Sequence, residues 1–267
     1  MPASQNRQGL VSHHYGPQVI LLDHPFVTHL LAKLGHPHTV HPQMSWLMKR
    51  IYQVLCEQMM NLCFPLKSES VDTRMKEFHP QKGIWQGQVF EKNQKVIVTS
   101  VVRAGTVPGQ ICFDELCQVI NPSQVRQDFF FCSRQTNDKN EVVGTKISGQ
   151  KCLDDVDGAY IILPDPMGAT GSSLCEVVKY YHNKGQGKIK KVLALHMIIT
   201  PEYIRRVKQE FPDMIIIAGR LDRGLSSQKA LSEIPGTIID EEKGLDPRHY
   251  IVPGAGGVGE VMNNCFV

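Results

Sequence analysis

Residues 164–173 read PDPMGATGSS, and the segments on either side of them have different hydrophobic periods. Residues 159–163 form a continuous apolar run, which is typical of a buried β-strand. After the stretch, residues 172–182 carry apolar side chains at helical spacing: Leu174, Val177, Val178 and Tyr181. A small, glycine-containing loop between a strand and a helix is a building block of parallel sheets, so we predict a strand–loop–helix unit here.

The same alternation extends along most of the chain. Strands are predicted at residues 96–102, 129–131, 159–163, 192–199 and 214–218, and helices at 43–64, 108–119, 172–182 and 201–211. Continuous apolar strands that alternate with helices indicate an α/β fold with a mostly parallel, five-stranded core sheet flanked by helices. Ligands of such sheets bind at the carboxyl ends of the strands, which directs the search to the loops after residues 102, 163 and 218.

Composition sets the broad limits. The chain has 267 residues, of which 42% are hydrophobic and 21% charged, and this is ordinary for a globular protein with a sizeable core. We predict a single domain over residues 19–267, preceded by a flexible arm at residues 1–18. The 29 basic and 26 acidic side chains give a net charge of +3, which is too balanced to indicate a nucleic-acid-binding protein.

Cysteines and histidines do not form recognisable metal or disulfide patterns. The eight cysteines include no C-x-x-C pair, and the polar N-terminus has no apolar segment, so we expect free thiols in a cytoplasmic protein without membrane contact. Five of the eleven histidines crowd residues 24–41, but their spacing fits no standard ligand set and prolines interrupt the segment. We therefore predict no metal site from these histidines.

A second glycine-rich stretch, YIVPGAGGVGE at residues 250–260, contains the spacing G-x-G-x-x-G at Gly254, Gly256 and Gly259. A dinucleotide site needs a full helix after this loop and an acidic residue about 20 positions further on. Eight residues follow Gly259, and the pair Asn263-Asn264 among them is a helix stop signal. The stretch therefore does not indicate NAD binding.

The loop at residues 164–173 has the composition of a phosphate-binding turn. Its small residues allow backbone N–H groups to converge on one phosphate at a helix N-terminus, and Thr170, Ser172 and Ser173 add hydroxyl donors. Asp165, at the end of the strand, suits ribose hydroxyls or a bridging Mg²⁺ ion. No lysine follows the glycines, so the loop is not that of a nucleoside triphosphatase. Taken alone, the loop is also compatible with an ordinary strand-to-helix turn.

DPMGATGSS resembles the loop of the uracil phosphoribosyltransferases that binds phosphoribosyl pyrophosphate (PRPP), whose usual form is DPMLATGGS. Further segments resemble family landmarks in the family's order: DHPFVTHLLAKL at 23–34, VVRAG at 101–105, FFFCSR at 129–134, GRLDRGL at 219–225 and YIVPGAGGVGE at 250–260. The resemblance covers about residues 19–261 and identifies the chain as a divergent member of this type I phosphoribosyltransferase family. It implies a hood built from N- and C-terminal segments, a homodimer, and Mg²⁺ as cofactor.

The resemblance implies a PRPP site at matching positions of this chain. These are Arg103, Arg134, Asp165, Pro166, Met167, Gly168, Ala169, Thr170, Gly171, Ser172 and Ser173. Arg103 matches the family arginine that contacts pyrophosphate, and Arg134 matches a hairpin arginine that reaches PRPP. The polar segment after Arg134, residues 135–144, is expected to act as a lid. Two positions depart from the family loop, since Gly168 replaces a leucine and Ser172 replaces a glycine.

The implied base site comprises Ile251, Gly256, Gly257 and Val258. The family has an aspartate at the position of Gly257, and we expect Gly257→Asp to raise activity toward uracil. Glu260 and Asp222 are candidate supporting acids. Residues 226–249 are an insertion relative to the family, expected beside the base site. There they can reshape specificity, cover the site, contact a partner or form a neutral surface excursion.

The implied activity is transfer of the phosphoribosyl group from PRPP to uracil, giving UMP and pyrophosphate in pyrimidine salvage. Two alternatives remain open on the sequence. Because of the loss at Gly257 and the insertion, the chain can be a PRPP- or nucleotide-binding regulatory homologue with little catalysis. It can also be a phosphoribosyltransferase for another base.

Overall fold

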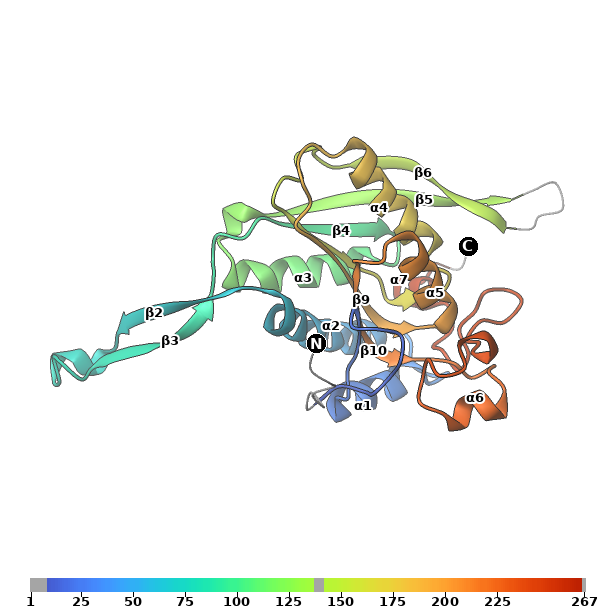
Figure 1. Cartoon of the computed structure of the whole chain (residues 1–267), viewed down its shortest axis with the longest axis horizontal. Helices are drawn as coiled ribbons and strands as arrows, with labels where there is room; N and C mark the ends of the chain where they lie inside the picture. The colour runs from blue at the N-terminus through green and yellow to red at the C-terminus, as the bar shows by residue number, and fades with distance from the viewer. Residues whose placement is uncertain (1–8, 137–141, 266–267) are drawn as a thin grey trace.

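The computed structural model describes residues 9–136 and 142–265, without the side chains of residues 134–143 (Figure 1). The strands are β1 (Val19–Leu21), β2 (Leu66–Asp72), β3 (Ile84–Phe90), β4 (Val96–Val102), β5 (Val125–Thr136), β6 (Val142–Lys151), β7 (Tyr160–Pro164), β8 (Met167–Gly168), β9 (Lys191–Ile199) and β10 (Ile215–Leu221). The α-helices are α1 (Pro25–Leu34), α2 (Gln43–Cys63), α3 (Thr106–Val119), α4 (Ser172–Lys184), α5 (Pro201–Glu210), α6 (Gln228–Ser232) and α7 (Val258–Asn263). Short 3₁₀ helices cover Arg74–Glu77, Pro122–Gln124 and Ile239–Glu241.

All five predicted strands are present as consecutive parallel members of one sheet, in the order β10-β9-β7-β4-β5. This confirms the predicted fold class. The sheet is wider than five strands, because β1 pairs in parallel with β10, β6 pairs antiparallel with β5, and β8 pairs with β9. The strands β1 and β8 have three and two residues, too few for a hydrophobic period to reveal them.

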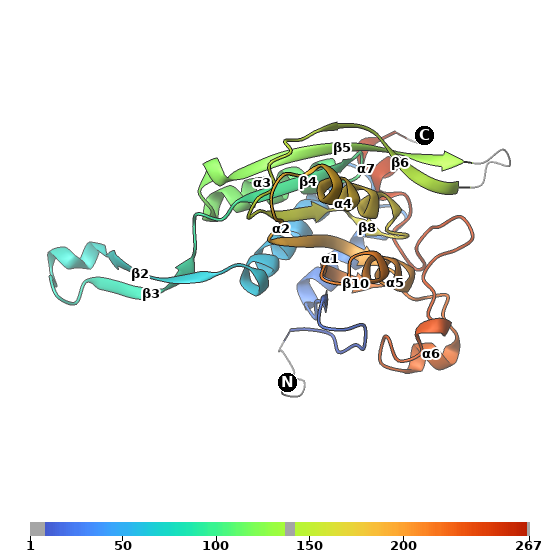
Figure 2. The same ribbon diagram turned by 45° about the horizontal axis from the view of Figure 1, so that its top comes forward.

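Helices cover both faces of the sheet (Figure 2). Successive side chains along a core strand point alternately to the two helix layers. In β4, Val96 and Val98 pack with the cluster that contains α1, α2 and α3, whereas Ile97 packs with the cluster that contains α4 and α5. Helix α2 follows the predicted period closely and ends just before Pro65. This two-sided burial explains why the strands are continuous apolar runs.

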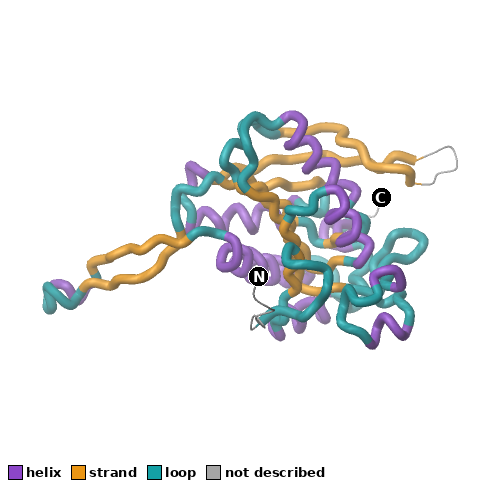
Figure 3. The backbone as a smooth tube through the Cα atoms, viewed as in Figure 1, coloured by secondary structure: helices purple, strands orange, loops and turns teal. Residues whose placement is uncertain are grey.

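The hairpin of β2 and β3 was not among the predicted elements. Its seven residue pairs form a separate antiparallel sheet that projects away from the body (Figures 1 and 3). None of its strand residues is buried, so the sequence LKSESVD has no core-facing apolar run to mark it as a strand. Several large apolar side chains of the hairpin are exposed: Leu66, Val71, Met75, Phe78 and Trp85.

The predicted flexible arm, residues 1–18, is described from residue 9 onward. Tyr15 is 2% exposed, and its hydroxyl donates a hydrogen bond to Glu242. The N–H of His14 donates to the carbonyl of Pro235 at 2.7 Å. The described part of this segment therefore packs against residues 226–249, the segment expected from the sequence to be an insertion and called the inserted segment below.

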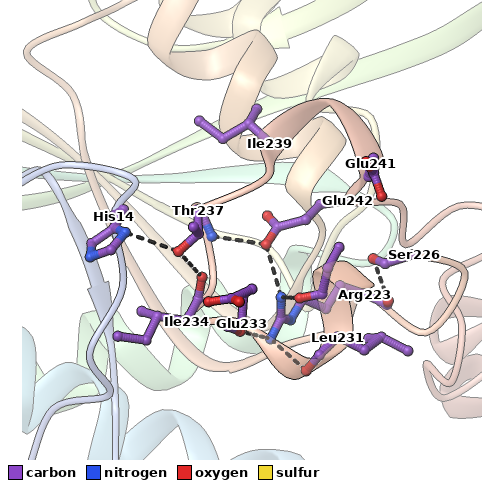
Figure 4. A network of polar contacts seen from close by, with 12 residues as sticks. His14, Arg223, Ser226, Leu231, Glu233, Ile234, Thr237, Ile239, Glu241 and Glu242 are labelled. Atoms are coloured by element: carbon purple, nitrogen blue, oxygen red, sulfur yellow. Dashed lines mark hydrogen bonds and ion pairs between the residues drawn. The ribbon is translucent and has the colours of Figure 1, made fainter. Parts of the chain in front are cut away.

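A buried ion pair fastens the inserted segment to the end of β10 (Figure 4). Arg223 Nη1 donates to Glu242 Oε1 at 2.8 Å, and Glu242 is 0% exposed. Glu242 also accepts the N–H of Gly236 at 2.9 Å, while the guanidinium of Arg223 donates to the carbonyls of Ala230 and Glu233. A buried charge pair whose remaining hydrogen-bonding positions are filled resists separation, so the segment is held in place.

The C-terminal segment packs on the N-terminal helices. Ile251, Val258 and Met262 are buried in the same cluster as α1 and α2. The loop before α7 approaches the end of α1 so closely that a Cβ on Gly35 would lie 3.2 Å from the carbonyl oxygen of Gly254. In the described part of the chain, no helix combines the length and the apolar character needed to cross a bilayer.

Candidate active site

The parallel strands β4, β7, β9 and β10 end at one edge of the sheet, and the loops beyond them enclose two adjoining cavities. The cavity of about 390 Å³ is lined by the loop after β7 together with Arg206. The cavity of about 710 Å³ is lined by Arg103 and the loop at residues 250–260. Four residues line both cavities: Asp165, Met167, Ala169 and His249. A ligand that occupies both cavities passes these four residues.

Hydrogen bonds from β9 and from Thr200, the residue after β9, hold the loop that follows β7. The carbonyl of Pro166 accepts N–H groups from β9, and Thr200 donates its hydroxyl to the carbonyl of Ala169 at 2.7 Å. Gly171 has a φ of +75°, a conformation that favours glycine, and it precedes the first turn of α4. The predicted loop residues Gly168 to Ser173 all line the 390 Å³ cavity, at the N-terminus of a 13-residue helix.

Arg206 of α5 adds a positive charge to this cavity. Its Nη1 donates to the hydroxyl of Ser172 at 2.7 Å, and its Nε donates to Glu210 at 2.9 Å. The hydroxyls of Ser172 and Thr170 are 3.1 Å apart. A glycine at position 172 would have no hydroxyl to receive the guanidinium. Sequence reasoning missed Arg206, because it is 33 residues beyond Ser173 and belongs to no motif.

Asp165 lies where the two cavities meet. Its Oδ1 accepts the N–H of Met167 at 3.1 Å, and its own N–H donates to the carbonyl of Leu195 at 3.0 Å. Burial of the carboxylate raises the pKa of Asp165 to about 6, and the hydrogen bond from Met167 opposes this shift only in part. The carboxylate is thus close to its midpoint of ionisation in mildly acidic solution.

A buried histidine and tyrosine lie beneath the same loop. His196 Nδ1 is 2.7 Å from the carbonyl oxygen of Asp165, and Nε2 is 2.6 Å from the hydroxyl of Tyr203. Since a carbonyl only accepts, Nδ1 carries the proton and Nε2 accepts from the tyrosine. Burial lowers the pKa of His196 to about 4, which keeps the ring neutral. Both residues escaped the sequence analysis because His196 lies in an apolar strand and Tyr203 in an amphipathic helix.

Arg103, predicted to contact pyrophosphate, follows β4 and lines the 710 Å³ cavity. Its Nη1 donates to the carbonyl of Cys265 at 3.3 Å, and no carboxylate among the described side chains forms an ion pair with it. Arg134 lies in β5, where its backbone pairs with Thr145, but its side chain is not described. The centre of the predicted lid, residues 137–141, lies outside the described residues.

The predicted base-site residues Ile251, Gly256, Gly257 and Val258 all line the 710 Å³ cavity. A Cβ added to Gly257 would displace the carboxylate of Glu260, which is the end of a flexible side chain and also lines this cavity. The acidic group of Glu260 therefore occupies the space beside Gly257 where an aspartate side chain would begin. We therefore no longer expect Gly257→Asp to raise activity, because the new carboxylate would lie next to that of Glu260.

Asp222, the other candidate acid, lines none of the described cavities. It is 2% exposed and forms two hydrogen bonds with Arg220, at 2.6 and 2.8 Å. It also accepts the N–H of Gly254 at 2.7 Å, while Arg220 donates to the carbonyl of Gly254 at 3.1 Å. The pair thus fastens the start of the glycine-rich loop to β10, and its geometry is that of a structural support.

The inserted segment contributes two residues to the two adjoining cavities, Arg248 and His249. Arg248 pairs with Asp246 and its guanidinium lies over the ring of Tyr250, 5.6 Å from the centroid. His249 lines the 390 Å³ and 710 Å³ cavities and also a third of about 470 Å³. The sequence placed the insertion beside the base site but gave no signal for these two side chains.

A parallel α/β sheet with a glycine-rich turn, a neighbouring carboxylate and an arginine at its carboxyl edge is an arrangement typical of nucleotide-binding α/β proteins. Comparisons with known proteins narrow this class. The family model described as uracil phosphoribosyltransferase matches residues 20–238. The match ends before the loop at residues 250–260.

Individual relatives of this family align with nearly the whole chain. The uracil phosphoribosyltransferase of Dictyoglomus thermophilum is 28% identical over 243 residues, covering 91% of this chain and 97% of that protein. The enzyme of the same name from Saccharomyces cerevisiae is 26% identical over 231 residues, covering 86% and 88%. The structure of the AQ2163 protein from Aquifex aeolicus has the same fold, with a TM-score of 0.66, 18% identity and coverage of 91% and 97%. The chain belongs to the uracil phosphoribosyltransferase family, as a divergent member, and its function is that of a phosphoribosyltransferase-like enzyme.

The opposed pKa shifts of His196 and Asp165 predict how stability depends on pH. The pKa of His196 falls from 6.5 to about 4 on folding, so the unfolded chain takes up this proton first and stability falls as the pH drops through that window. The pKa of Asp165 rises from 3.8 to about 6, so the folded chain takes up this proton first and stability rises as the pH drops from about 6 to 3.8. Each contribution is about 3 kcal/mol, and the two nearly cancel.

Single variants should expose each contribution. Relative to the wild type, Asp165→Asn is expected to lose about 2 kcal/mol of unfolding free energy between pH 6.5 and 4, and His196→Gln is expected to gain about as much. Urea denaturation at a series of pH values measures both differences. Parallel pH profiles for the three proteins would contradict the assignment of these pKa values.

Proposed function

We propose that this chain transfers the phosphoribosyl group of PRPP to uracil, releasing pyrophosphate and forming UMP. The observation that carries the proposal is the pair of adjoining cavities, one at the phosphate-type loop and one at Arg103 and the base loop, with Asp165 where they meet. PRPP has a phosphate at one end, a ribose in the middle and a pyrophosphate at the reacting carbon. These parts match the order of the lining residues.

In the proposed reaction, N1 of uracil forms a bond to C1′ of PRPP, and the bond from C1′ to the pyrophosphate oxygen breaks. The electron pair leaves with pyrophosphate, and the proton of N1 is lost. The loop at Gly168 to Ser173 binds the 5′-phosphate through backbone N–H groups and hydroxyls. Arg103 binds the departing pyrophosphate, where its charge offsets the negative charge that develops. No covalent intermediate with the protein is needed, because positioning and electrostatics suffice.

The base is held by the loop at residues 250–260, with Ile251 and Gly256 to Val258 at the cavity wall. Asp165 accepts hydrogen bonds from the ribose hydroxyls through its carboxylate. Support by Asp222 and Arg220 keeps the loop at a fixed distance from β10. The protein thus holds nucleophile, sugar and leaving group in line, and exclusion of bulk water strengthens each polar contact.

Mg²⁺ is the proposed cofactor. The donors present fit an ion held mainly by substrate, because Asp165 offers one carboxylate beside the cavity and the described residues contain no group of three or more protein ligands. Magnesium typically binds one or two carboxylates together with phosphate oxygens and water. When bound, it neutralises charge on the pyrophosphate. Asp165 would hold it.

Pyrophosphate release with PRPP, Mg²⁺ and a panel of bases tests the proposal directly. We expect release with uracil and none above background without a base. Release with a different base alone would assign the chain to that base, an alternative favoured by Gly257 and the inserted Arg248 at the base end of the site. No release with any base, despite PRPP binding by calorimetry, would identify a binding protein with little catalysis and overturn the proposal.

The carboxylate of Glu260 is proposed to replace the aspartate that is absent at Gly257. Glu260→Gln is then expected to lower kcat/KM for PRPP by about tenfold, the scale of one hydrogen bond to a charged group. Gly257→Asp alone should also lower it, since two carboxylates would compete for one space. The double variant Gly257→Asp, Glu260→Ala should recover part of the loss. Steady-state kinetics of all three variants decide this, and an increase for Gly257→Asp alone would contradict it.

We also propose that the chain forms a homodimer through the β2–β3 hairpin. An isolated two-stranded hairpin is marginally stable in water, and this one exposes Phe78 and Trp85 at 69% and 45%. A second copy that covers these side chains would stabilise both. Trp85→Ser with Phe78→Ser is expected to convert dimers to monomers in sedimentation equilibrium. Trp46→Ser is a matched control, since Trp46 is 67% exposed on α2, and the same loss in this control would contradict the proposal.

A further inference from the structure

We propose that His249 is a substrate-binding residue, supplied by the inserted segment, that contacts the sugar of a bound phosphoribosyl ligand. The inference deepens the proposed function and assigns a role to the insertion at residues 226–249. It rests on the position of His249, on its backbone conformation and on the contacts that hold it.

The position of His249 is at the junction of the two cavities. It is one of four residues that line both the phosphate-loop cavity and the base-loop cavity. In any phosphoribosyl nucleotide the ribose lies between the 5′-phosphate and the base. A ligand with its phosphate in the first cavity and its base in the second therefore has its sugar at this junction.

A ligand at the junction needs a hydrogen-bond donor for its acceptor atoms, and three of the four junction side chains do not provide one. Asp165 is a hydrogen-bond acceptor when ionised, which suits the ribose hydroxyls, whereas the side chains of Met167 and Ala169 are apolar. A phosphoribosyl ligand also presents acceptors near the sugar, namely the ring oxygen and the oxygens of the attached phosphates. Among the four side chains at the junction, the imidazole of His249 provides an N–H donor for these atoms.

The backbone of His249 is in a conformation that non-glycine residues rarely adopt. Its φ is +64°, and Asn264 is the one other non-glycine residue with positive φ in the described part of the chain. Such a conformation is unfavourable for a histidine and persists where neighbouring contacts impose it, often at ligand sites. A glycine would adopt it without strain, so the presence of histidine points to a use for the side chain.

A dense set of hydrogen bonds imposes this conformation. Asp246 Oδ1 accepts the N–H groups of Arg248 and Tyr250 at 2.9 and 2.8 Å, and the carbonyl of Asp246 accepts the N–H of His249 at 2.9 Å. The N–H of Asp246 donates to the carbonyl of Tyr250 at 2.9 Å, which closes the turn. These bonds lower the pKa of Asp246, so the carboxylate that organises the turn stays ionised.

The turn is fixed to the body of the protein at its base. The carboxylate of Glu202, at the start of α5, accepts the N–H groups of Gly244 at 3.0 Å and Leu245 at 3.2 Å. The N–H of Val252 donates to the carbonyl of Gly244 at 2.8 Å. Further back, the buried pair of Arg223 and Glu242 secures the rest of the insertion (Figure 4). His249 is thus placed by a supported turn, as a preorganised binding residue requires.

The test compares His249→Gly with the wild-type protein in two measurements. Isothermal titration calorimetry with PRPP and with ribose 5-phosphate should show affinity lower by about tenfold or more, the loss of one hydrogen bond to a charged ligand. The melting temperature without ligand should stay the same or rise, because glycine removes the strain at φ +64°. His249→Asn, which tolerates the same φ and keeps an N–H donor, should restore part of the affinity.

Asn264→Gly is the matched control. It makes the same kind of backbone change at the other positive-φ position, and Asn264 lines none of the three cavities, so ligand affinity should not change. A His249→Gly protein that binds PRPP and ribose 5-phosphate as tightly as the wild type would overturn the inference. So would a variant that melts at lower temperature with unchanged affinity, since this indicates a purely structural role.

The His249 experiment and the pyrophosphate-release assay can succeed or fail independently. A wild-type protein that binds PRPP in a His249-dependent way but releases no pyrophosphate with any base supports the inference and overturns the catalytic proposal. Pyrophosphate release with uracil in both wild type and His249→Gly, with equal KM for PRPP, supports the catalytic proposal and overturns the inference. Binding of neither PRPP nor ribose 5-phosphate by the wild type overturns both.

Discussion

The ring of Tyr203 fills the space directly beneath the phosphate-type loop, and the loop sequence follows from this packing. A Cβ on Gly168 would lie 2.8 Å from Ile199 Cγ2 and 3.2 Å from the tyrosine ring, and one on Gly171 would also lie 3.2 Å from that ring. A side chain at position 168 would have to displace Ile199 or Tyr203, so glycine fits this packing and larger residues do not.

The same tyrosine joins three successive parts of the fold. Its hydroxyl donates to His196 on β9, whose other nitrogen donates to the carbonyl of Asp165 at the end of β7. Thus a helix, its preceding strand and the neighbouring strand determine together where the carboxylate lies. Because His196 stays neutral, this link is a hydrogen-bonded support that adds no charge beneath the phosphate site.

The sequence predicted the core because buried parallel strands are continuous apolar runs and because loops at their carboxyl ends carry the ligand chemistry. It did not predict the β2–β3 hairpin, whose strands bury no side chain. Among the site residues, Asp165 lies directly after its strand and was a candidate for that reason, whereas Arg103 became a candidate through the family resemblance. Arg206 and His249 reach the cavities only through tertiary contacts, and no local pattern encodes such contacts. Asp222 is an acidic residue near the site, but its hydrogen bonds to Arg220 and Gly254 give it a structural role in holding the loop.

The departures from the family at the base end converge on one cavity. Gly257 leaves space that the carboxylate of Glu260 fills, and the insertion brings Arg248 to the same wall. These changes are coupled in space although they are separated along the chain. A motif that appears degraded when read position by position can therefore still present an acid and a cation to the ligand.

The arrangement of charge along the joined cavities is more informative than the net charge of +3. Arg206 lies at the end formed by the phosphate-type loop, Arg103 and Arg248 lie in the other cavity, and Asp165 lies between them. PRPP has anionic groups at both ends and hydroxyl donors in its middle. Under the proposed function, the arginines at the two ends bind the anionic groups and Asp165 accepts the hydroxyls, while Glu260 adds an acid to the cavity of Arg103. A uniformly basic cleft would instead attract any polyanion. Under the proposed function, this local placement of charge would favour a small phosphorylated sugar in a protein whose overall charge is almost balanced.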